Sequence, residues 1–285
     1  MCWGSLAFSV MVLGVKWSTA TLPALEVVFF RSLLGSLMMT GLMIRKKVPF
    51  IGKPEQRKFL LMRGIAGFLA LSLHFYTISV LPLGTAVMLN YTGPIFVALL
   101  AAIFLGERPG GFLISMTLVS FSGVYLLVSP RHLLFRGEAI PLFLAILSAI
   151  LAAVAVLAIR IIRHRESPLT VIFYFTAIST LGSLFYLPFG FKWPALKEWF
   201  ALLLVAGGSF YGQLWMTIAY RRAPASLVSS FSYVTPLLAF FYGLIFWKET
   251  LAWTNLAGAS LIILGGTLIS VFEARRSGRL PFPAA

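Results

Sequence analysis

Most of this chain consists of long apolar runs separated by short polar segments. The runs are about 17 to 25 residues long, which is the length of a helix that crosses a bilayer. A transmembrane barrel would instead alternate apolar and polar residues over segments of about ten residues. The pattern therefore predicts an all-α integral membrane protein with ten transmembrane helices. The expected helices are Trp3–Ser18, Pro23–Ile44, Phe59–Val80, Thr85–Leu105, Phe112–Val128, Ile140–Ile162, Thr170–Phe189, Trp199–Tyr220, Ser226–Trp247 and Trp253–Phe272.

The composition indicates that lipid solvates much of the surface. Of the 285 residues, 60% are hydrophobic and only 11% are charged, whereas a soluble domain carries about 25% charged residues. The formal net charge is +15, and most Lys and Arg fall in loops on one side of the expected helices, such as residues 45–58 and 275–279. Because cytoplasmic loops collect Lys and Arg, we expect both termini in the cytoplasm and no nucleic-acid partner. The first apolar run is expected to be a retained helix and not a signal peptide, with a longer natural N-terminus as the alternative.

The second half of the chain repeats the first. When the sequence is shifted against itself by 142 residues, several identical residues coincide without a gap. Each half holds five expected helices, so the second half must enter the membrane in the opposite sense. The sequence therefore predicts two inverted repeats, residues 1–136 and 137–285, a common construction of secondary transporters whose substrate site lies between the halves. The coinciding pairs include Tyr91 and Tyr233, Pro94 and Pro236, Glu107 and Glu249, and Gly123 and Gly265.

Two of these pairs have a physical reason. Pro94 and Pro236 are predicted to kink their helices, because a proline removes a backbone hydrogen bond; the kinks are either fixed bends or flexible points for alternating access. Glu107 and Glu249 are expected to lie at the N-terminal end of the next helix, where a carboxylate is favourable, with proton coupling as the alternative. Polar neighbours can bond the carbonyl groups that the prolines free: Asn90, Thr92, Ser232 and Thr235.

The doubled pattern consists of Pro94…Gly106-Glu107…Gly123 and Pro236…Lys248-Glu249…Gly265, with an arginine, Arg31, in the second helix. Over essentially the whole chain, this pattern resembles the drug/metabolite transporter superfamily and its ten-helix EamA-type members. The resemblance implies a secondary exporter in a bacterial inner membrane, without an ATP site or cofactor, and is closest in character to exporters of aromatic and other amino acids. Two positions depart from the pattern: Thr176 or its neighbours stand where the counterpart of Arg31 is expected, and Lys248 replaces a glycine.

Polar residues inside spanning helices are costly, so each is a candidate for substrate binding. His74 is the only histidine in an expected helix, with a satisfied interhelical histidine as the alternative reading. Gln213 precedes Met216, the repeat counterpart of His74, by three residues on the same helix face. The resemblance implies that both helices line a central cavity. Asn90 and Trp17 are further candidates, with support of the proline kink and an interfacial aromatic as their respective alternatives.

Glu26 is the one acidic residue that we expect to be buried. Lys16 and Arg31 are expected either to bind a substrate carboxylate or to pair with Glu26. Because few acids and no cluster of several cations are expected near the cavity, lipophilic cations and sugar phosphates are disfavoured as substrates.

The sequence thus predicts a secondary active transporter that exports small amphipathic metabolites, with neutral or aromatic amino acids as the expected class. The alternatives are a multidrug or other metabolite exporter of the same fold, an intramembrane enzyme and a channel. Cys2 is the single cysteine, and the chain has no His-Glu-x-x-His motif, so no catalytic residue, metal or cofactor is expected. The expected partners of a monomer are the lipid bilayer and a small-molecule substrate.

Overall fold

The computed structural model describes residues 1–104, 111–128, 139–162, 165–222, 232–249 and 252–276. Within these residues the chain is helical and contains no strand, which confirms the predicted all-α class. The helices are α1 (Cys2–Ser18), α2 (Ala24–Arg45), α3 (Arg57–Val80), α4 (Leu83–Asn90), α5 (Gly93–Phe104), α6 (Gly111–Val128), α8 (Ala139–Ile162), α9 (Pro168–Leu184), α10 (Leu196–Arg222), α12 (Val234–Trp247) and α13 (Trp253–Arg276), with short 3-10 turns η1 (Pro54–Gln56) and η2 (Leu187–Phe189). By length and composition, four segments can cross a bilayer: Ala24–Arg45, Pro54–Val80, Ala139–Ile159 and Leu196–Met216.

The largest difference from the expected helices lies at Tyr91 and Thr92. The prediction of one continuous helix over Thr85–Leu105 is wrong, because α4 ends before these two residues and α5 begins after them. A proline is tolerated in the first turn of a helix, where its missing N–H has no intrahelical partner anyway. Pro94 therefore lies in the first turn of α5 and does not kink a continuous helix. At the break, Thr92 Oγ1 donates to the Leu89 carbonyl over 2.7 Å.

In the second half, the residues that correspond to this break lie at the start of a helix. α12 begins directly after Tyr233, and Pro236 again lies in its first turn. The expected start of this helix at Ser226 lies outside the described residues. The rings of Tyr91 and Tyr233 face each other with centroids 6.3 Å apart. Since these two residues correspond in the repeat, the two helix ends meet on the axis that relates the halves.

α9 is shorter than predicted. The expected helix reached Phe189, but α9 ends at Leu184 and the chain forms the separate 3-10 turn η2. Pro188 lies in that turn, and a proline disfavours helical backbone at the residue before it, so the helix ends upstream.

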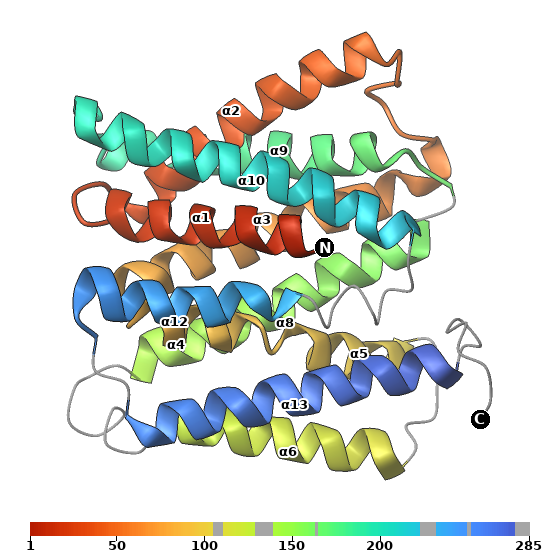
Figure 1. Cartoon of the computed structure of the whole chain (residues 1–285). Helices are drawn as coiled ribbons and strands as arrows, with labels where there is room; N and C mark the ends of the chain where they lie inside the picture. The colour runs from red at the N-terminus through yellow and green to blue at the C-terminus, as the bar shows by residue number, and fades with distance from the viewer. Residues whose placement is uncertain (105–110, 129–138, 163–164, 223–231, 250–251, 277–285) are drawn as a thin grey trace.

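Corresponding helices of the two halves pack against each other (Figure 1). α2 packs against α9, and α6 packs against α13, so each of these helices is paired with its own counterpart in the repeat; α4 packs against α12, which corresponds to α5. α1 packs against α10, and α3 packs against α8. In the repeat α1 corresponds to α8 and α3 corresponds to α10, so these two contacts are equivalent. This internal two-fold relation is the one that inverted repeats predict.

The contact between α6 and α13 follows the same relation residue by residue. A Cβ atom at Gly123 would lie 2.6 Å from the carbonyl oxygen of Gly258, and one at Gly265 would lie 2.9 Å from the carbonyl oxygen of Met116. Met116 and Gly258 are separated by the same 142 residues as the two glycines. Gly123 and Gly265 therefore correspond in the structure, and both let two helix backbones approach closely.

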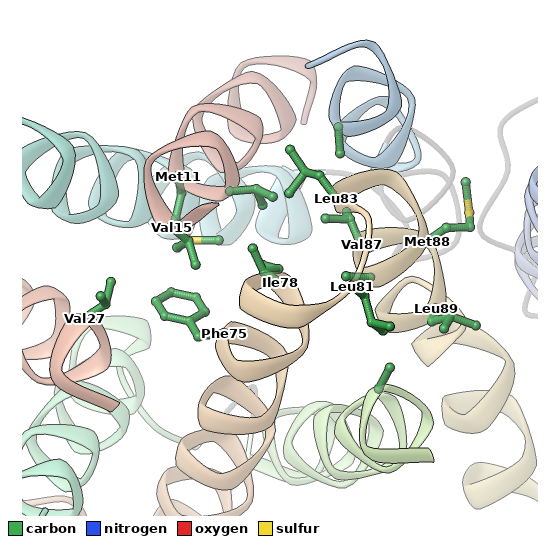
Figure 2. Close-up of a cluster of buried hydrophobic side chains, with 14 of the residues drawn as sticks. Met11, Val15, Val27, Phe75, Ile78, Leu81, Leu83, Val87, Met88 and Leu89 are labelled. Carbon is green, nitrogen blue, oxygen red and sulfur yellow. The ribbon is translucent and has the colours of Figure 1, made fainter. Parts of the chain in front are cut away.

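A cluster of buried apolar side chains lies where α1, α2, α3 and α4 meet, toward the C-terminal end of α3 (Figure 2). In Figure 2, Phe75 and Ile78 of α3 lie among side chains from the other three helices. We call this set the apolar cluster; close packing of such side chains stabilises helix association in a membrane. Its labelled members are Met11, Val15, Val27, Phe75, Ile78, Leu81, Leu83, Val87, Met88 and Leu89.

Candidate functional site

One face of α3 carries several of the buried polar residues. Arg63, Gly67, Ala70, His74 and Thr77 are spaced alternately by four and three residues, and all are buried. This spacing places them on one face of the helix. We call this surface the polar α3 face, and it is the part of the bundle on which a polar substrate would find hydrogen-bonding groups.

Two arginines share one aromatic ring at this face. Arg63 Cζ lies 4.2 Å from the ring centroid of Phe175 on α9, and Arg31 Cζ on α2 lies 5.3 Å from the same centroid. Only 3% of Arg31 and 7% of Arg63 are exposed. Arg31 Nε donates to Ser209 Oγ over 2.7 Å, but Arg31 Nη1 and Arg63 Nε have no hydrogen-bond partner within the described chain. We call Arg31 and Arg63 the arginine pair. Each of these buried side chains has an N–H donor without a hydrogen-bond acceptor among the described residues.

The arginine pair lies deep in the bundle. Ser209 is the middle residue of α10, so the bond from Arg31 reaches the centre of that helix. Gly67 corresponds to Ser209 in the repeat, and a Cβ atom at Gly67 would lie 2.8 Å from the Phe175 ring and against Arg63 Nη1. Gly67 and Ser209 therefore occupy equivalent positions in the two halves, but the side chains around them differ in chemistry. The first half supplies both cations, and the second half supplies the ring and the hydroxyl group.

This arrangement bears on two expectations from the sequence. Two cations, Arg31 and Arg63, lie together on one aromatic ring, whereas the sequence predicts no cluster of several cations near the cavity. Arg31 contacts Ser209 and not Glu26. Sequence reasoning misses Arg63 as a site residue, although an arginine inside an apolar run is itself a signal. Phe175 gives no such signal, because phenylalanine is ordinary in a spanning helix.

His74 lies on the polar α3 face, about three helical turns beyond Arg63. It is 7% exposed, and no described residue bonds its Nδ1 atom. The neighbouring hydrogen bond, from Thr77 Oγ1 to the His74 carbonyl over 2.8 Å, is local to α3. His74 is thus not the fully satisfied interhelical histidine of the alternative reading, and its contact with substrate stays a prediction.

Asn90, the last residue of α4, joins three helices. Its Nδ2 atom donates to Ser148 Oγ on α8 over 2.8 Å, and Ser148 Oγ donates to the Ala70 carbonyl on α3 over 2.8 Å. Asn90 therefore does not bond a carbonyl freed by Pro94. It ties the helix break to the polar α3 face, and its role in substrate binding stays a prediction.

Gln213 and Met216 lie on α10 beyond Ser209, and both are half-buried. α1 packs closely on this stretch, since a Cβ atom at Gly4 would lie 3.3 Å from the Met216 amide nitrogen. The described parts of α3 and α10 do not form a packed pair. A pocket shared by His74 and Gln213 would thus lie between helices that are not packed closely against each other along their described parts.

Trp17 lies near the end of α1 and is 38% exposed. Its ring contacts Phe246 at 5.4 Å and Trp247 at 6.3 Å between centroids, both at the end of α12. Partly exposed aromatic rings at helix ends are typical of the interfacial belt. These contacts favour the interfacial role of Trp17 over a cavity role.

Lys16 and Glu249 hold the corner between α3 and α4. Lys16 Nζ donates to the carbonyl groups of Ile78 at 2.9 Å and Leu81 at 2.6 Å, at the end of α3. Both carboxylate oxygens of Glu249 accept from the Leu83 amide at the start of α4, at 2.9 and 3.0 Å. A cation at a helix C-terminus and a carboxylate at an N-terminus are each favourable. We call Lys16 and Glu249 the corner clamp; Glu249 caps α4 of the other half, where the sequence led us to expect the next helix.

Glu26 and Glu107 are the remaining acidic residues singled out from the sequence. Glu26 is fully buried, as predicted, and its Oε2 atom accepts from the Lys192 amide over 3.1 Å in the first turn of α2. Glu107 lies outside the described residues. Within the described ranges, no group of three His, Cys, Asp or Glu side chains could hold a metal ion.

Comparison with known proteins gives consistent matches over almost the full length. The model of the EamA-like transporter family matches residues 1–129 and again residues 139–271. A pseudopaline exporter of Pseudomonas aeruginosa is 35% identical over 267 residues, which is 93% of this chain and 93% of that protein. Human solute carrier family 35 member G1 is 26% identical, over 90% of this chain and 73% of its own. An S-adenosylmethionine uptake transporter of Rickettsia bellii is 24% identical, over 92% and 88%.

A solved structure shares the fold. A crystal structure of a protein that is 21% identical to this chain superposes with a TM-score of 0.66 and covers 96% of this chain and 98% of its own. At that identity the likeness concerns the arrangement of the helices alone.

Proposed function

Because this chain belongs to the EamA-like transporter family, we propose that it is a secondary active exporter of small amphipathic metabolites. The two halves rock around a central site and open it to each side of the membrane in turn. Nucleotide and cofactor are not required. The relatives include both an exporter and an uptake transporter, and the more similar of the two, at 35% identity against 24%, is the exporter.

The observation that best supports this mechanism is the meeting of the end of α4 with the start of α12. Discontinuous membrane helices at the interface between repeats build the substrate sites of many secondary transporters. Here α4 ends at the Tyr91–Thr92 break and α12 begins after Tyr233, and the two tyrosine rings meet 6.3 Å apart. Pro94 and Pro236 follow in the first turns of α5 and α12. In the proposal, these turns are the flexible points at which the halves move.

Amino acids with large apolar side chains, aromatic ones included, are the substrate class that we propose. Glu26 is the one fully buried acid among the described residues, and it lies in the first turn of α2, where its Oε2 atom accepts from the Lys192 amide and its Oε1 atom has no hydrogen-bond partner among the described residues. A lipophilic cation would thus find one buried carboxylate, near the end of α2, and none beside the arginine pair in the described bundle. Other metabolites or drugs carried by the same fold are the alternative.

The proposed binding surface is the polar α3 face together with the part of α10 beyond Ser209. His74 and Asn90 contact the substrate from one side, and Gln213 and Met216 from the other. Two observations support this placement: His74 has an unbonded ring nitrogen among the described residues, and Asn90 is anchored to the carbonyl of Ala70 through a serine.

We place the protein in a bacterial inner membrane with both termini in the cytoplasm. The excess of Lys and Arg in residues 45–58 and 275–279 supports this orientation. Reporter fusions after Arg279 and within residues 45–58 should report cytoplasm, and a fusion within residues 129–136 should report the outside. A cytoplasmic signal from residues 129–136 would contradict the orientation.

The transport proposal is tested with the full chain in nucleotide-free proteoliposomes. Labelled phenylalanine, tryptophan and methionine should exchange by counterflow, and protein-free liposomes give the background. His74→Ala should change the rate or the half-saturation concentration. Transport of ethidium-like cations with none of the three amino acids would contradict the substrate class. No solute movement under any ion or solute gradient would contradict secondary transport.

A further inference from the structure

We propose that Arg31 and Arg63 bind the carboxylate of the transported molecule, which lies between Arg31 Nη1 and Arg63 Nε beside the ring of Phe175. The inference rests on the proposed transport function and adds a chemical requirement to it. The substrate must carry a carboxylate, whereas an ammonium group is dispensable. Organic acids with an apolar body therefore belong to the substrate class alongside amino acids.

The arginine pair lacks the negative partner that buried arginines normally have. A buried charge is strongly unfavourable unless it is paired and hydrogen-bonded. A guanidinium group carries five N–H donors, yet the hydroxyl of Ser209 is the one hydrogen-bond acceptor that the described residues offer to Arg31. Arg63 Nε and Arg31 Nη1 are left without a partner in the same part of the chain. A carboxylate supplies the missing charge and two acceptor oxygens, and planar guanidinium groups match its geometry.

A purely structural role for the arginine pair does not fit its surroundings. An arginine near a helix end can extend its head to the membrane surface, but Arg31 bonds Ser209 in the middle of α10. Stacking on Phe175 is favourable for both cations, yet the ring face cannot accept the in-plane N–H groups. Glu26 is not the partner either, since its Oε2 atom accepts from the Lys192 amide and its Oε1 atom bonds neither arginine.

The corner clamp shows how this protein satisfies a half-buried charge when the role is structural. Lys16 donates to two carbonyl groups, and Glu249 accepts from the Leu83 amide with both oxygens. The arginine pair has no comparable set of partners among the described residues. The contrast within one molecule points to a partner that comes from outside the chain.

The position of the subsite links binding to movement of the halves. Both cations belong to the first repeat, whereas Phe175 and Ser209 belong to the second. A bound carboxylate offsets the repulsion between the two arginines and lies against both halves at once. The apolar body of the substrate then contacts Phe175 and its neighbours.

The experiment uses three probes that share a phenyl ring: phenylacetate, phenylacetamide and phenethylamine. Each competes with labelled phenylalanine in counterflow by the full chain in proteoliposomes. Phenylacetate should compete, and the other two should be weaker by about ten- to hundredfold, the loss expected when one charge-assisted hydrogen bond is removed. Equal competition by phenylacetate and phenylacetamide would overturn the proposal.

Variants assign the effect to the arginine pair. Arg31→Gln and Arg63→Gln should each remove the preference for the acid over the amide, and Arg31→Lys, which keeps the charge, should retain part of it. Lys58→Gln is the matched control, because Lys58 lies over the ring of Phe59 at 5.0 Å on the same helix as Arg63 but is exposed. An unchanged preference in both glutamine variants would also overturn the proposal.

A binding measurement separates failure of this inference from failure of the transport function. If no labelled solute moves, thermal unfolding of the purified chain in detergent is followed with phenylacetate and with phenylacetamide. Stabilisation by the acid alone, lost in Arg31→Gln, supports the subsite although transport has failed. Equal stabilisation by both probes, or by neither, contradicts it. If amino acids are transported but phenylacetate competes no better than phenylacetamide, the transport function is supported and the proposed carboxylate subsite is contradicted.

Discussion

Two regions along α3 enclose charged side chains, and their surroundings differ. At the C-terminal end of α3, Lys16 and Glu249 are half-buried and bond backbone groups at the end of α3 and the start of α4. In the N-terminal half of α3, Arg63 lies with Arg31 on the ring of Phe175, and both keep donors with no partner among the described residues. Both regions are enclosed by helices of both repeats. Only at the corner clamp do residues of the chain itself supply hydrogen-bond partners for both charged groups.

We interpret this difference as a division of roles: the corner clamp stabilises the fold, and the arginine pair binds a ligand. Around the corner clamp, the apolar cluster packs where four helices meet, so charge and packing act together to hold this end of the bundle. At the arginine pair, two donors of buried cations, Arg31 Nη1 and Arg63 Nε, have no acceptor among the described residues, an arrangement that proteins keep mainly where a ligand completes it. Removing a group should therefore lower stability in the first region and alter ligand selection in the second.

The largest effect is expected from Phe75→Ala in the apolar cluster. Phe75 is fully buried, and removing a buried phenylalanine ring costs about 3–5 kcal/mol in stability. Denaturant unfolding in detergent measures the loss. Tyr76→Ala is the control, since Tyr76 is the next residue on α3 and is exposed. Equal losses from the two substitutions would show that the cluster is not the stabilising unit.

Glu249→Gln should give the next largest effect. The amide keeps the shape of the side chain but removes the charge that caps α4, and a hydrogen bond to a charged group contributes about 1.5–3 kcal/mol. The same unfolding assay should show this loss, with phenylacetate binding unchanged. Glu55→Gln, at an exposed position, serves as control. A change in binding selectivity without a loss of stability would reverse the roles that we assign to the two regions.

Lys16→Met should cost about 1–2 kcal/mol, since the side chain is partly buried and loses two bonds to carbonyl groups. The double substitution with Glu249→Gln tests the clamp as a unit. Because both residues hold one corner, their effects should deviate from additivity by about 0.5 kcal/mol or more. If the losses of stability from the two single substitutions add up to the loss in the double variant, Lys16 and Glu249 stabilise the corner independently.

Arg31→Gln should have the smallest effect on stability, within about 1 kcal/mol, because the lost bond to Ser209 is offset by removal of an unpaired buried charge. Ser209→Ala isolates the contribution of the hydrogen bond. The same unfolding assay measures both variants. A loss from Arg31→Gln as large as that from Glu249→Gln would identify Arg31 as a structural charge.

Several features of the fold follow from the sequence because they depend on composition or on short-range pattern. The length of the apolar runs predicts helices and a membrane, and the shift of 142 residues predicts the repeat that pairs Gly123 with Gly265. The family likeness rests on the same doubled pattern. The burial of Glu26 could be predicted because it is the one acid inside an apolar run.

The candidate site depends on relations that the sequence does not contain. Arg31, Phe175 and Ser209 come from three helices, and Glu249 caps a helix that begins 166 residues earlier. Which face of a helix turns inward depends on packing with neighbours distant in the chain, so a polar residue in an apolar run is visible in the sequence but its partner is not. Proline likewise fits a kink or a first turn equally well. The sequence alone determined helices, repeat and family, and the tertiary structure decided which charges are satisfied and which are left for a ligand.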